Sequence, residues 1–220
     1  MRKPLIIFGN GQMAESFHSK FNALGEYEVV GFTVDRDFMQ DERLLGLPVV
    51  PFDELGSHFR PGEVEAFVSV GPVKNNQIRA GRFRELKAQG YRLANWVSPL
   101  AMVSRDARIG ENCSIGDYTL VQPHATVQDN AHIGSASIVG HHCMICQHAY
   151  LALHVVMAGS VTIGERAFLG AGVTIRDNVT IGEAAVIGAG STILRDIEDD
   201  SVYTAPSAVK LPMRSDQARL

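Results

Sequence analysis

The stretch SVTIGERAFLGAGVTI, residues 160–175, carries an aliphatic residue at every sixth position: Ile163, Leu169 and Ile175. The same spacing continues without an insertion from Val103 to Ile193, through sixteen aliphatic residues or methionines. A chain that is 45% hydrophobic does not produce such a run by chance. A short, exact period over about ninety residues is the signature of a repeat solenoid.

Each six-residue unit is predicted to form one short strand and one turn, with its aliphatic residue pointing inward. Three units complete a triangular coil, so equivalent residues of successive coils lie over one another at about 4.8 Å, the spacing of neighbouring strands. Many units continue with glycine, as in IGENCS and IGERAF. We expect this glycine to accommodate the tight corner. The run then gives roughly five coils.

The first 97 residues follow a different pattern, in which apolar runs alternate with amphipathic segments. The predicted strands are 5–9, 27–35, a short one with a turn in 47–55, 64–71 and 91–98, and the predicted helices are 9–25 and 75–90. A β-α-β series of this kind implies a small parallel sheet covered by helices, a Rossmann-like half. We therefore divide the chain into an α/β domain at 1–97 and a β-helix domain with a C-terminal tail at 98–220.

The composition excludes several classes of protein. A net charge of −4 and a pI near 6.0 leave no basic footprint for nucleic acid. No apolar run approaches the ~18–20 residues of a membrane span, and glycines follow the N-terminal apolar run too soon for a signal peptide. Three cysteines, an odd number, fit reduced thiols. We expect a cytoplasmic protein that binds neither nucleic acid nor membranes.

The segment GHHCMICQHAYLALH, residues 140–154, holds four of the eight histidines and two of the three cysteines. A zinc site needs about four converging ligands. Four histidines stand three places after an aliphatic residue: His124, His142, His148 and His154. Only the first two are separated by exactly three units, so the other two fall on other faces of the coil. We therefore predict no metal site, and we interpret the cysteines as small repeat residues.

The repeat half resembles the hexapeptide-repeat acyltransferases, which fold as a left-handed parallel β-helix. The two-part plan resembles the sugar acetyltransferases of the sialic-acid O-acetyltransferase and bacillosamine or perosamine N-acetyltransferase type. The matching segments, which span essentially the whole chain, are IIFGNGQMAE, VSVGPVKNNQIR, VGHHC, SVTIGERAFLGAGVTI and VYTAPSAVKL. The resemblance implies a homotrimer with sites in the grooves between β-helices, acetyl-CoA along the groove, and a nucleotide-linked sugar held by the N-terminal domain.

The family base is a histidine in a V-x-H-[DE]-C segment, matched here by residues 139–143, which implies that His141 is the base. Neutral imidazole suits proton abstraction near pH 7. Spacing alone leaves the alternative of a solvent-exposed turn residue. Many relatives have an acidic residue after the base, whereas this chain has His142. We place His142 with His141 and Gly159 among the predicted catalytic residues. Either another group orients His141, including one on an adjacent subunit, or His142 takes a different task such as contacting the sugar.

Gly159 follows His141 by exactly three units, so we expect it one coil away. The family places a glycine amide at this spacing, where it donates a hydrogen bond to the thioester oxygen as charge develops. The alternative is an ordinary corner glycine. Direct transfer from CoA needs no protein nucleophile, so we assign no acyl-carrying role to Cys143.

The resemblance places CoA against the later coils, where two Gly-Ala-Gly segments, one coil apart, present small side chains to the pantetheine arm. The predicted CoA-binding residues are Gly159, Gly170, Ala171, Gly172, Gly188, Ala189, Arg195 and Lys210. The last two are candidates for the CoA phosphates, with ordinary solvated charges as the alternative.

The GNG at 9–11 lacks the third glycine of the dinucleotide fingerprint, but its place between strand and helix favours a phosphate at the helix N-terminus. Asp35 ends a strand, where it can bind a ribose or a base. The resemblance implies that a nucleotide-sugar pocket is lined by Gly9, Asn10, Gly11, Asp35 and Gly71. We expect no NAD binding, because the sheet is too short for a two-lobed dinucleotide fold.

These observations and the resemblance together predict an acetyl-CoA-dependent N-acetyltransferase that acts on a nucleotide-linked amino sugar in surface glycan biosynthesis. The alternatives are O-acetylation of a sugar such as sialic acid, transfer of another acyl group, and a non-enzymatic β-helical scaffold.

Overall fold

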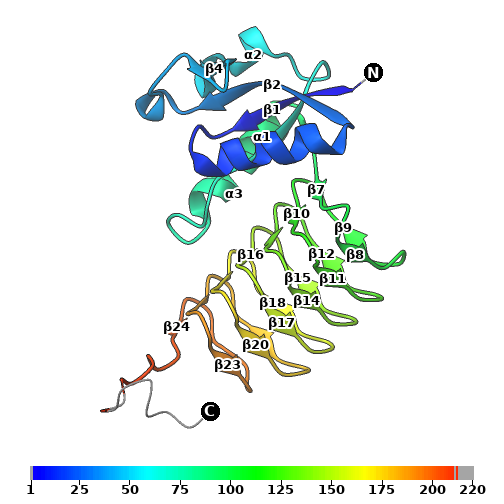
Figure 1. The fold of residues 1–220 in the computed structure, drawn as a ribbon, viewed down its shortest axis with the longest axis vertical. Coiled ribbons are helices and arrows are strands. Elements are labelled where there is room, and N and C mark those ends of the chain that lie inside the picture. Colours follow the sequence, from blue (N-terminus) through cyan, green and yellow to red (C-terminus); the bar gives the residue numbers. More distant parts are fainter. Residues whose placement is uncertain (1, 211, 213–220) are drawn as a thin grey trace.

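The computed structural model describes residues 2–210 and 212, and it has two parts (Figure 1). The N-terminal part is an α/β unit around one six-stranded sheet in the order β3-β4-β2-β1-β5-β6. Its elements are β1 (Lys3–Phe8), α1 (Gln12–Leu24), β2 (Tyr27–Val34), η1 (Arg36–Phe38), β3 (Arg43–Leu44), β4 (Leu47–Pro51), η2 (Phe52–Glu54), α2 (Leu55–His58), β5 (Glu65–Val68), α3 (Gln77–Ala88) and β6 (Arg92–Leu93). All neighbouring strands pair in parallel except β3, which is antiparallel to β4.

Helices cover both faces of this sheet. Helix α1 begins after Gly11 and ends at Gly25, whose φ of 73° suits glycine, as the sequence predicts. Its Phe17 and Phe21 pack with Phe67 and other buried residues on one face. Residues of α3 and α2 pack in a second buried cluster on the other face. The predicted small parallel sheet between helices is confirmed.

The second part is a β-helix of two-residue strands. Its strands are β7 (Trp96–Val97), β8 (Met102–Val103), β9 (Arg108–Ile109), β10 (Ser114–Ile115), β11 (Leu120–Val121), β12 (Thr126–Val127), β13 (His132–Ile133), β14 (Ile138–Val139), β15 (Met144–Ile145), β16 (Tyr150–Leu151), β17 (Val156–Met157), β18 (Thr162–Ile163), β19 (Phe168–Leu169), β20 (Thr174–Ile175), β21 (Thr180–Ile181), β22 (Val186–Ile187), β23 (Thr192–Ile193) and β24 (Val202–Tyr203). Each of the sixteen predicted aliphatic positions is the second residue of a strand. The left-handed parallel β-helix that the sequence analysis anticipated is therefore the fold of this part.

The strands form three faces, which we name after their first strands. The β7 face continues through β10, β13, β16, β19, β22 and β24; the β8 face through β11, β14, β17, β20 and β23; the β9 face through β12, β15, β18 and β21. The three corners are named after their residues. The glycine corner (Tyr118, Ala136, His154, Gly172, Gly190) joins the β7 and β8 faces, the histidine corner (Asp106, His124, His142, Ser160, Asn178) joins the β8 and β9 faces, and the docking corner (Asn112, Asn130, His148, Arg166, Ala184) joins the β9 and β7 faces.

The corners correct one expectation about glycine. The turn is made by the residue three places after the aliphatic one, which has a left-handed backbone, as at His124 with φ 62° and His142 with φ 58°. The glycine directly after the aliphatic residue serves another purpose. A Cβ on Gly140 would collide with the carbonyl oxygens of Met157 and Ala158 in the next coil. Close stacking of coils, not the turn itself, is what excludes larger residues there.

The start of the β-helix corrects a second expectation. Residues 91–98 do not form one strand, because β6 joins the α/β sheet whereas β7 pairs with β10 of the β-helix. Asn95 makes the transition: its Nδ2 donates to the carbonyl of Gly110 at 2.6 Å, and its Oδ1 accepts from the amide of Cys113 at 2.8 Å. The hydrogen-bonded β-helix thus begins at Trp96, slightly before the predicted boundary at 98.

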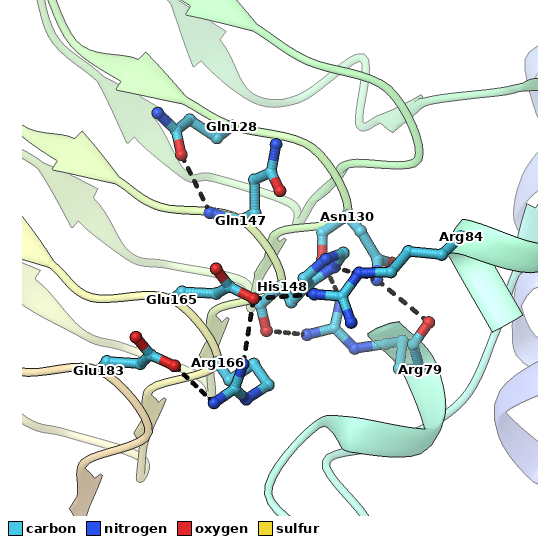
Figure 2. A network of polar contacts seen from close by, with 9 residues as sticks. All are labelled: Arg79, Arg84, Gln128, Asn130, Gln147, His148, Glu165, Arg166 and Glu183. Atoms are coloured by element: carbon cyan, nitrogen blue, oxygen red, sulfur yellow. Dashed lines mark hydrogen bonds and ion pairs between the residues drawn. The ribbon is translucent and has the colours of Figure 1, made fainter. Parts of the chain in front are cut away.

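A buried arginine links the α/β part to the docking corner, alongside other hydrogen bonds and ion pairs (Figure 2). Arg79 of α3 is 2% exposed. Its guanidinium donates to the carbonyls of Asn130, His148 (2.6 Å) and Ala149 (3.2 Å), and to Oδ1 of Asn76 (3.0 Å). Burial lowers the pKa of Arg79 to about 10, which still leaves it charged at neutral pH.

The docking corner itself is a ladder of polar side chains. Nδ2 of Asn112 donates to Oδ1 of Asn130 at 2.8 Å, and Nδ2 of Asn130 donates to Nδ1 of His148 at 2.8 Å. At its edge, Arg84 of α3 pairs with Glu165 at 2.9 Å. Arg166 bridges the same Glu165 and Glu183 in the next coil (Figure 2). Among the described residues, no helix is long and apolar enough to cross a membrane.

His148 should make the fold acid-sensitive. Because it is fully buried, the pKa of His148 falls to about 3 from an ordinary 6.5. The unfolded chain therefore takes up a proton first as the pH falls, so this contribution to stability is full above pH 6.5 and is lost toward pH 3. The decrease in the free energy of unfolding between pH 7 and pH 5 should be roughly 2 kcal/mol smaller for His148→Asn than for the unsubstituted protein, as measured by urea denaturation. The exposed His154, in the same backbone conformation, supplies the control His154→Asn, which should keep the original pH dependence. Equal pH dependence in all three proteins would contradict a neutral, buried His148.

Candidate functional site

His141 lies at the histidine corner, between β14 and β15, with its side chain exposed. Its backbone is tied to the coils on both sides. Its N–H donates to Oε1 of Gln122 at 3.0 Å, and its carbonyl accepts from the amide of Ser160 at 2.8 Å. The peptide is thereby fixed, whereas the imidazole faces outward over the next coil.

The imidazole of His141 lies directly over Gly159. The pairing of Val139 with Met157 sets this register, and a Cβ on Gly159 would collide with Cε1 and Nε2 of the ring. The predicted adjacency of the two residues is confirmed, and their chemical roles stay a prediction. Only glycine permits this approach, because any side chain at 159 would displace the ring.

The amide of Gly159 is available to a ligand. At equivalent places in other coils, the N–H groups of His141 and Gln147 are capped by Oε1 of Gln122 and Gln128, which stand in the preceding coil. The position that corresponds for Gly159 is Gly140, which has no side chain. Within residues 2–210, the Gly159 N–H accordingly donates to no protein acceptor. A free amide next to an exposed imidazole can bind an oxygen that becomes negatively charged.

A column of side chains continues from His141 along the histidine corner. Nδ1 of His141 lies 3.2 Å from Nδ1 of His142. The ring of His142 packs against that of His124, with centroids 4.7 Å apart. Nδ1 of His124 lies 3.0 Å from Oδ2 of Asp106. Sequence reasoning missed Asp106, although it stands exactly one coil before His124 and the repeat period would have found it.

The remaining histidines of the β-helix lie elsewhere, as the spacing predicts for His148 and His154. His148 is buried at the docking corner and His154 is exposed at the glycine corner. His132, on the β7 face, was not singled out from the sequence. Its Nδ1 contacts Oγ of Ser114 at 2.5 Å, and burial lowers the pKa of His132 to about 3. None of these three adjoins His141.

The cysteines are buried or half-buried free thiols. Burial raises the pKa of Cys143 and Cys146, and raises that of Cys113 to about 12. A thiol kept protonated is a poor nucleophile. The described part of the chain contains no group of three or more His, Cys, Asp or Glu residues arranged to hold a metal ion.

Apart from Gly159, the predicted CoA-binding residues form a separate group. The 170–172 and 188–190 segments stack directly, and the amide of Gly190 donates to the carbonyl of Ala171 at 2.8 Å. They lie at the glycine corner, with the whole β8 face between them and His141. Arg195 follows β23 and Lys210 lies in the tail, and both are exposed. One chain thus does not bring these residues to His141.

The predicted nucleotide residues gather at the carboxyl ends of β1, β2 and β5. Gly9 has a φ of 125°, and a Cβ there would press on the carbonyl of Ser69. Nδ2 of Asn10 donates to the carbonyl of Phe38 at 2.8 Å. Gly11 directly precedes α1, and a half-buried Gly71 follows β5. The glycine-rich loop is therefore held open at the helix N-terminus.

Asp35 has a partner that the sequence did not reveal. Its Oδ2 pairs with Nη2 of Arg82 at 3.0 Å. Arg82 comes from α3, and its guanidinium lies 5.8 Å from the ring centroid of Phe8 and 5.3 Å from that of Phe52. A ligand at Asp35 would therefore meet an existing ion pair beside two aromatic rings.

The two groups of predicted site residues lie apart within the chain. Hydrogen bonds from the α/β part reach the docking corner and its neighbours, as those from Asn75 to Ala184 and from Asn76 to Arg166 show. The histidine corner is on a different edge of the triangle. Within one chain, the α/β part thus contacts a different corner from the one that carries His141.

Two family models match the chain. The PglD N-terminal domain matches residues 4–86, and the bacterial transferase hexapeptide (six repeats) matches residues 160–195. None of the curated protein sequences matches significantly.

Solved structures match over nearly the full length. PerB from Caulobacter crescentus, in complex with CoA and GDP-perosamine, is 30% identical, with 92% of this chain and 94% of that chain covered and a TM-score of 0.82. A perosamine N-acetyltransferase from the same organism with one histidine changed to asparagine, also with CoA and GDP-perosamine, is 29% identical over 92% and 93%, with a TM-score of 0.84. The acetyltransferase domain of PglB from Neisseria gonorrhoeae FA1090, with acetyl coenzyme A, is 26% identical over 93% and 97%, with a TM-score of 0.83.

Gly159→Ala tests the contact between ring and backbone. The added methyl group occupies the space of the His141 ring, so the ring should rotate away and lose its 3.2 Å contact with His142. A crystal structure of the variant checks this, and its melting temperature should stay close to the original because both groups are at the surface. Ser160→Ala, at the next position and exposed, is the control that should leave the ring in place. An unmoved ring in Gly159→Ala would show that Gly159 is only a corner residue.

Proposed function

This chain belongs to the hexapeptide-repeat sugar acetyltransferases, the type that includes perosamine N-acetyltransferase, and from that premise we propose that it acetylates the amine of a nucleotide-linked amino sugar, with His141 as the general base. It is an acyltransferase, and acetyl-CoA is its co-substrate. The proposal goes further in naming the base and the residues around it.

The observation that carries the proposal is the His141 ring over the free amide of Gly159. The amine attacks the thioester carbonyl carbon, and its proton passes to Nε2 of His141. The carbonyl oxygen becomes negative and accepts a hydrogen bond from the Gly159 N–H. When the C–S bond breaks, the thiolate of CoA leaves and takes the proton from the imidazolium. His141 and the neighbouring Gly159 amide thus serve both the attack on the thioester and the departure of the CoA thiolate.

Within one chain, most of the residues predicted to bind CoA and the nucleotide lie away from His141, and this separation supports a trimer. Three prisms around a threefold axis each turn one corner toward the axis. The docking corner carries the α/β part, so it cannot be that corner. Both remaining corners, the glycine corner and the histidine corner, border the β8 face. Whichever of them points toward the axis, the β8 face therefore lies in the interface between subunits. A neighbour packed there also brings a second α/β part and a second set of corners to the groove beside His141.

The surface of the β8 face fits this role. Its outward residues in four successive coils are apolar: Met102, Leu120, Ile138 and Val156. Met102 is 70% exposed and Ile138 37% exposed. A continuous apolar stripe of this kind on a single chain marks an interface.

The cellular setting belongs to the proposal as well. Three free thiols fit the reducing cytoplasm, which is also where CoA thioesters and nucleotide sugars are used. We place the reaction in the synthesis of a surface glycan.

The reaction can be tested with a panel of nucleotide-linked 3-amino and 4-amino sugars, each incubated with acetyl-CoA while the free thiol of CoA is followed. At least one amino sugar should release thiol and gain an acetyl group by mass spectrometry. Matched sugars with a hydroxyl in place of the amine should not react. Thiol release only with hydroxyl acceptors would contradict the N-acetyltransferase, and none with any acceptor would contradict the proposed transfer.

His141→Asn should lower kcat by about 10²–10⁴-fold, because positioned general-base catalysis contributes that much and asparagine cannot take the proton. Both KM values should change little, since asparagine keeps a similar size and some hydrogen bonding. His154→Asn, at the glycine corner, should change kcat by no more than a few-fold. Near-normal turnover of His141→Asn with an amine acceptor would show that the amine arrives already deprotonated.

Ile138→Asp should break the trimer, because a carboxylate placed in the apolar stripe is buried without a partner. Light scattering should report three chains for the unsubstituted protein and one for the variant, and acetyl transfer should disappear with the assembly. Leu45→Asp, a more exposed apolar site in the β3–β4 hairpin (54% against 37% for Ile138), is the control that should remain trimeric. An active Ile138→Asp monomer would contradict a site shared between subunits.

A further inference from the structure

The histidine corner carries three side chains that the mechanism above leaves without a task. Asp106, His124 and His142 occupy the same place in three successive coils. The last of them contacts the base. We propose that Asp106 and His124 are positioning residues for His141 and act through His142. The inference rests on the proposed function, in which His141 is the base.

The far end of the column is anchored by a carboxylate. Oδ2 of Asp106 lies 3.0 Å from Nδ1 of His124, and its Oδ1 accepts from the hydroxyl of Ser104 at 2.5 Å. The Ser104 hydrogen bond is the main cause that holds the pKa of Asp106 below its usual range, so this carboxyl is ionised. An ionised carboxylate can only accept, so it favours the form of His124 that carries a hydrogen on the neighbouring Nδ1.

The middle of the column is a contact between two rings. The rings of His124 and His142 are 4.7 Å apart at an angle of 44°. Both residues have the left-handed backbone of the corner, and the amide of His142 donates to the carbonyl of Pro123 at 3.1 Å. With the backbone fixed, the remaining freedom of His142 is rotation of its ring, and the neighbouring ring of His124 restricts it.

The orientation of the His142 ring decides whether His141 can act. The two Nδ1 atoms face each other at 3.2 Å, and only one of them can carry a hydrogen. If His142 donates, His141 holds its hydrogen on Nε2 and cannot take a proton there. Once His141 has taken a proton, both of its nitrogens carry hydrogen, so His142 must accept. A half-turn of the His142 ring would present a C–H group instead.

An acidic residue in place of His142 would not need such a column. A carboxylate accepts at either oxygen and cannot donate, so it holds the base in the right tautomer whichever way it turns. An imidazole does this only in one orientation and one tautomer. The Asp106–His124 pair supplies that orientation, and this explains why a histidine can stand where many relatives have an acidic residue.

The kinetic test compares two backgrounds. In the natural protein, His124→Ala and Asp106→Ala should each lower kcat by about ten-fold, with both KM values unchanged, because part of the general-base contribution is lost. His154→Ala, an exposed histidine with the same left-handed backbone at another corner, is the matched control and should be neutral.

In a His142→Glu background, His124→Ala and Asp106→Ala should have no further effect on kcat relative to that single variant. A purely structural role would produce the same loss in both backgrounds, and that result would overturn the proposal.

A second readout is independent of catalysis. Nitrogen-15 NMR of histidine-labelled protein, with the His141 signals assigned from His141→Asn, reports which ring nitrogen of His141 carries the hydrogen. The Nδ1–H form should dominate in the natural protein and in His142→Glu, and a mixture should appear in Asp106→Ala and His124→Ala. An unchanged tautomer in the last two variants would overturn the proposal even in an active enzyme. If the tautomer responds while no acceptor is acetylated, the column stands and the proposed function fails.

Discussion

The hydrogen-bond register between successive coils is the constraint on which the rest of this structure depends. Along the strands, alternate amides donate to carbonyls of the next coil, as from Trp96 to Cys113 and from Ala158 to Ile175. Each residue therefore lies over its counterpart in that coil. The inward aliphatic residues fill the space inside, and from Ile115 to Ile187 they are no more than 1% exposed. Because the register has no insertion in these coils, the contact between His141 and Gly159 follows from counting residues.

Counting also explains how much could be predicted. The strand positions, the separate corners of the histidines and the stacking of the Gly-Ala-Gly segments all follow from the period. The left-handed backbone at each corner could not be predicted from the period, because asparagine, histidine, alanine and arginine all occupy that position and show no common pattern. The last coil also departs from the rule: Ile187 pairs with Tyr203, whereas an unbroken period would pair it with Ala205, because the repeat has already ended there.

The docking of the α/β part could not be predicted from the repeat. Arg79 stands in a helix that reads as an ordinary amphipathic segment, yet its guanidinium enters the docking corner, and all of its acceptors are carbonyl or amide oxygens. Buried charge is costly unless it is well hydrogen-bonded, and the carbonyls at the corner provide those bonds. This insertion, with the neighbouring hydrogen bonds of Asn75 and Asn76, holds the α/β part on the docking corner. The α/β part leaves the β8 face and the histidine corner uncovered, so the residues predicted to bind the nucleotide lie away from His141, the proposed base of their own chain.

The central claim is that His141 and Gly159 of one chain meet a sugar nucleotide held by another. A crystal structure with CoA and the reactive nucleotide-linked amino sugar tests it most directly. The account predicts a trimer in which the acceptor amine lies within hydrogen-bonding distance of Nε2 of His141, the CoA sulfur lies beside the Gly159 amide, and the nucleotide contacts the glycine-rich loop of the partner subunit. A sugar bound entirely within one chain, or an amine remote from His141, would contradict it.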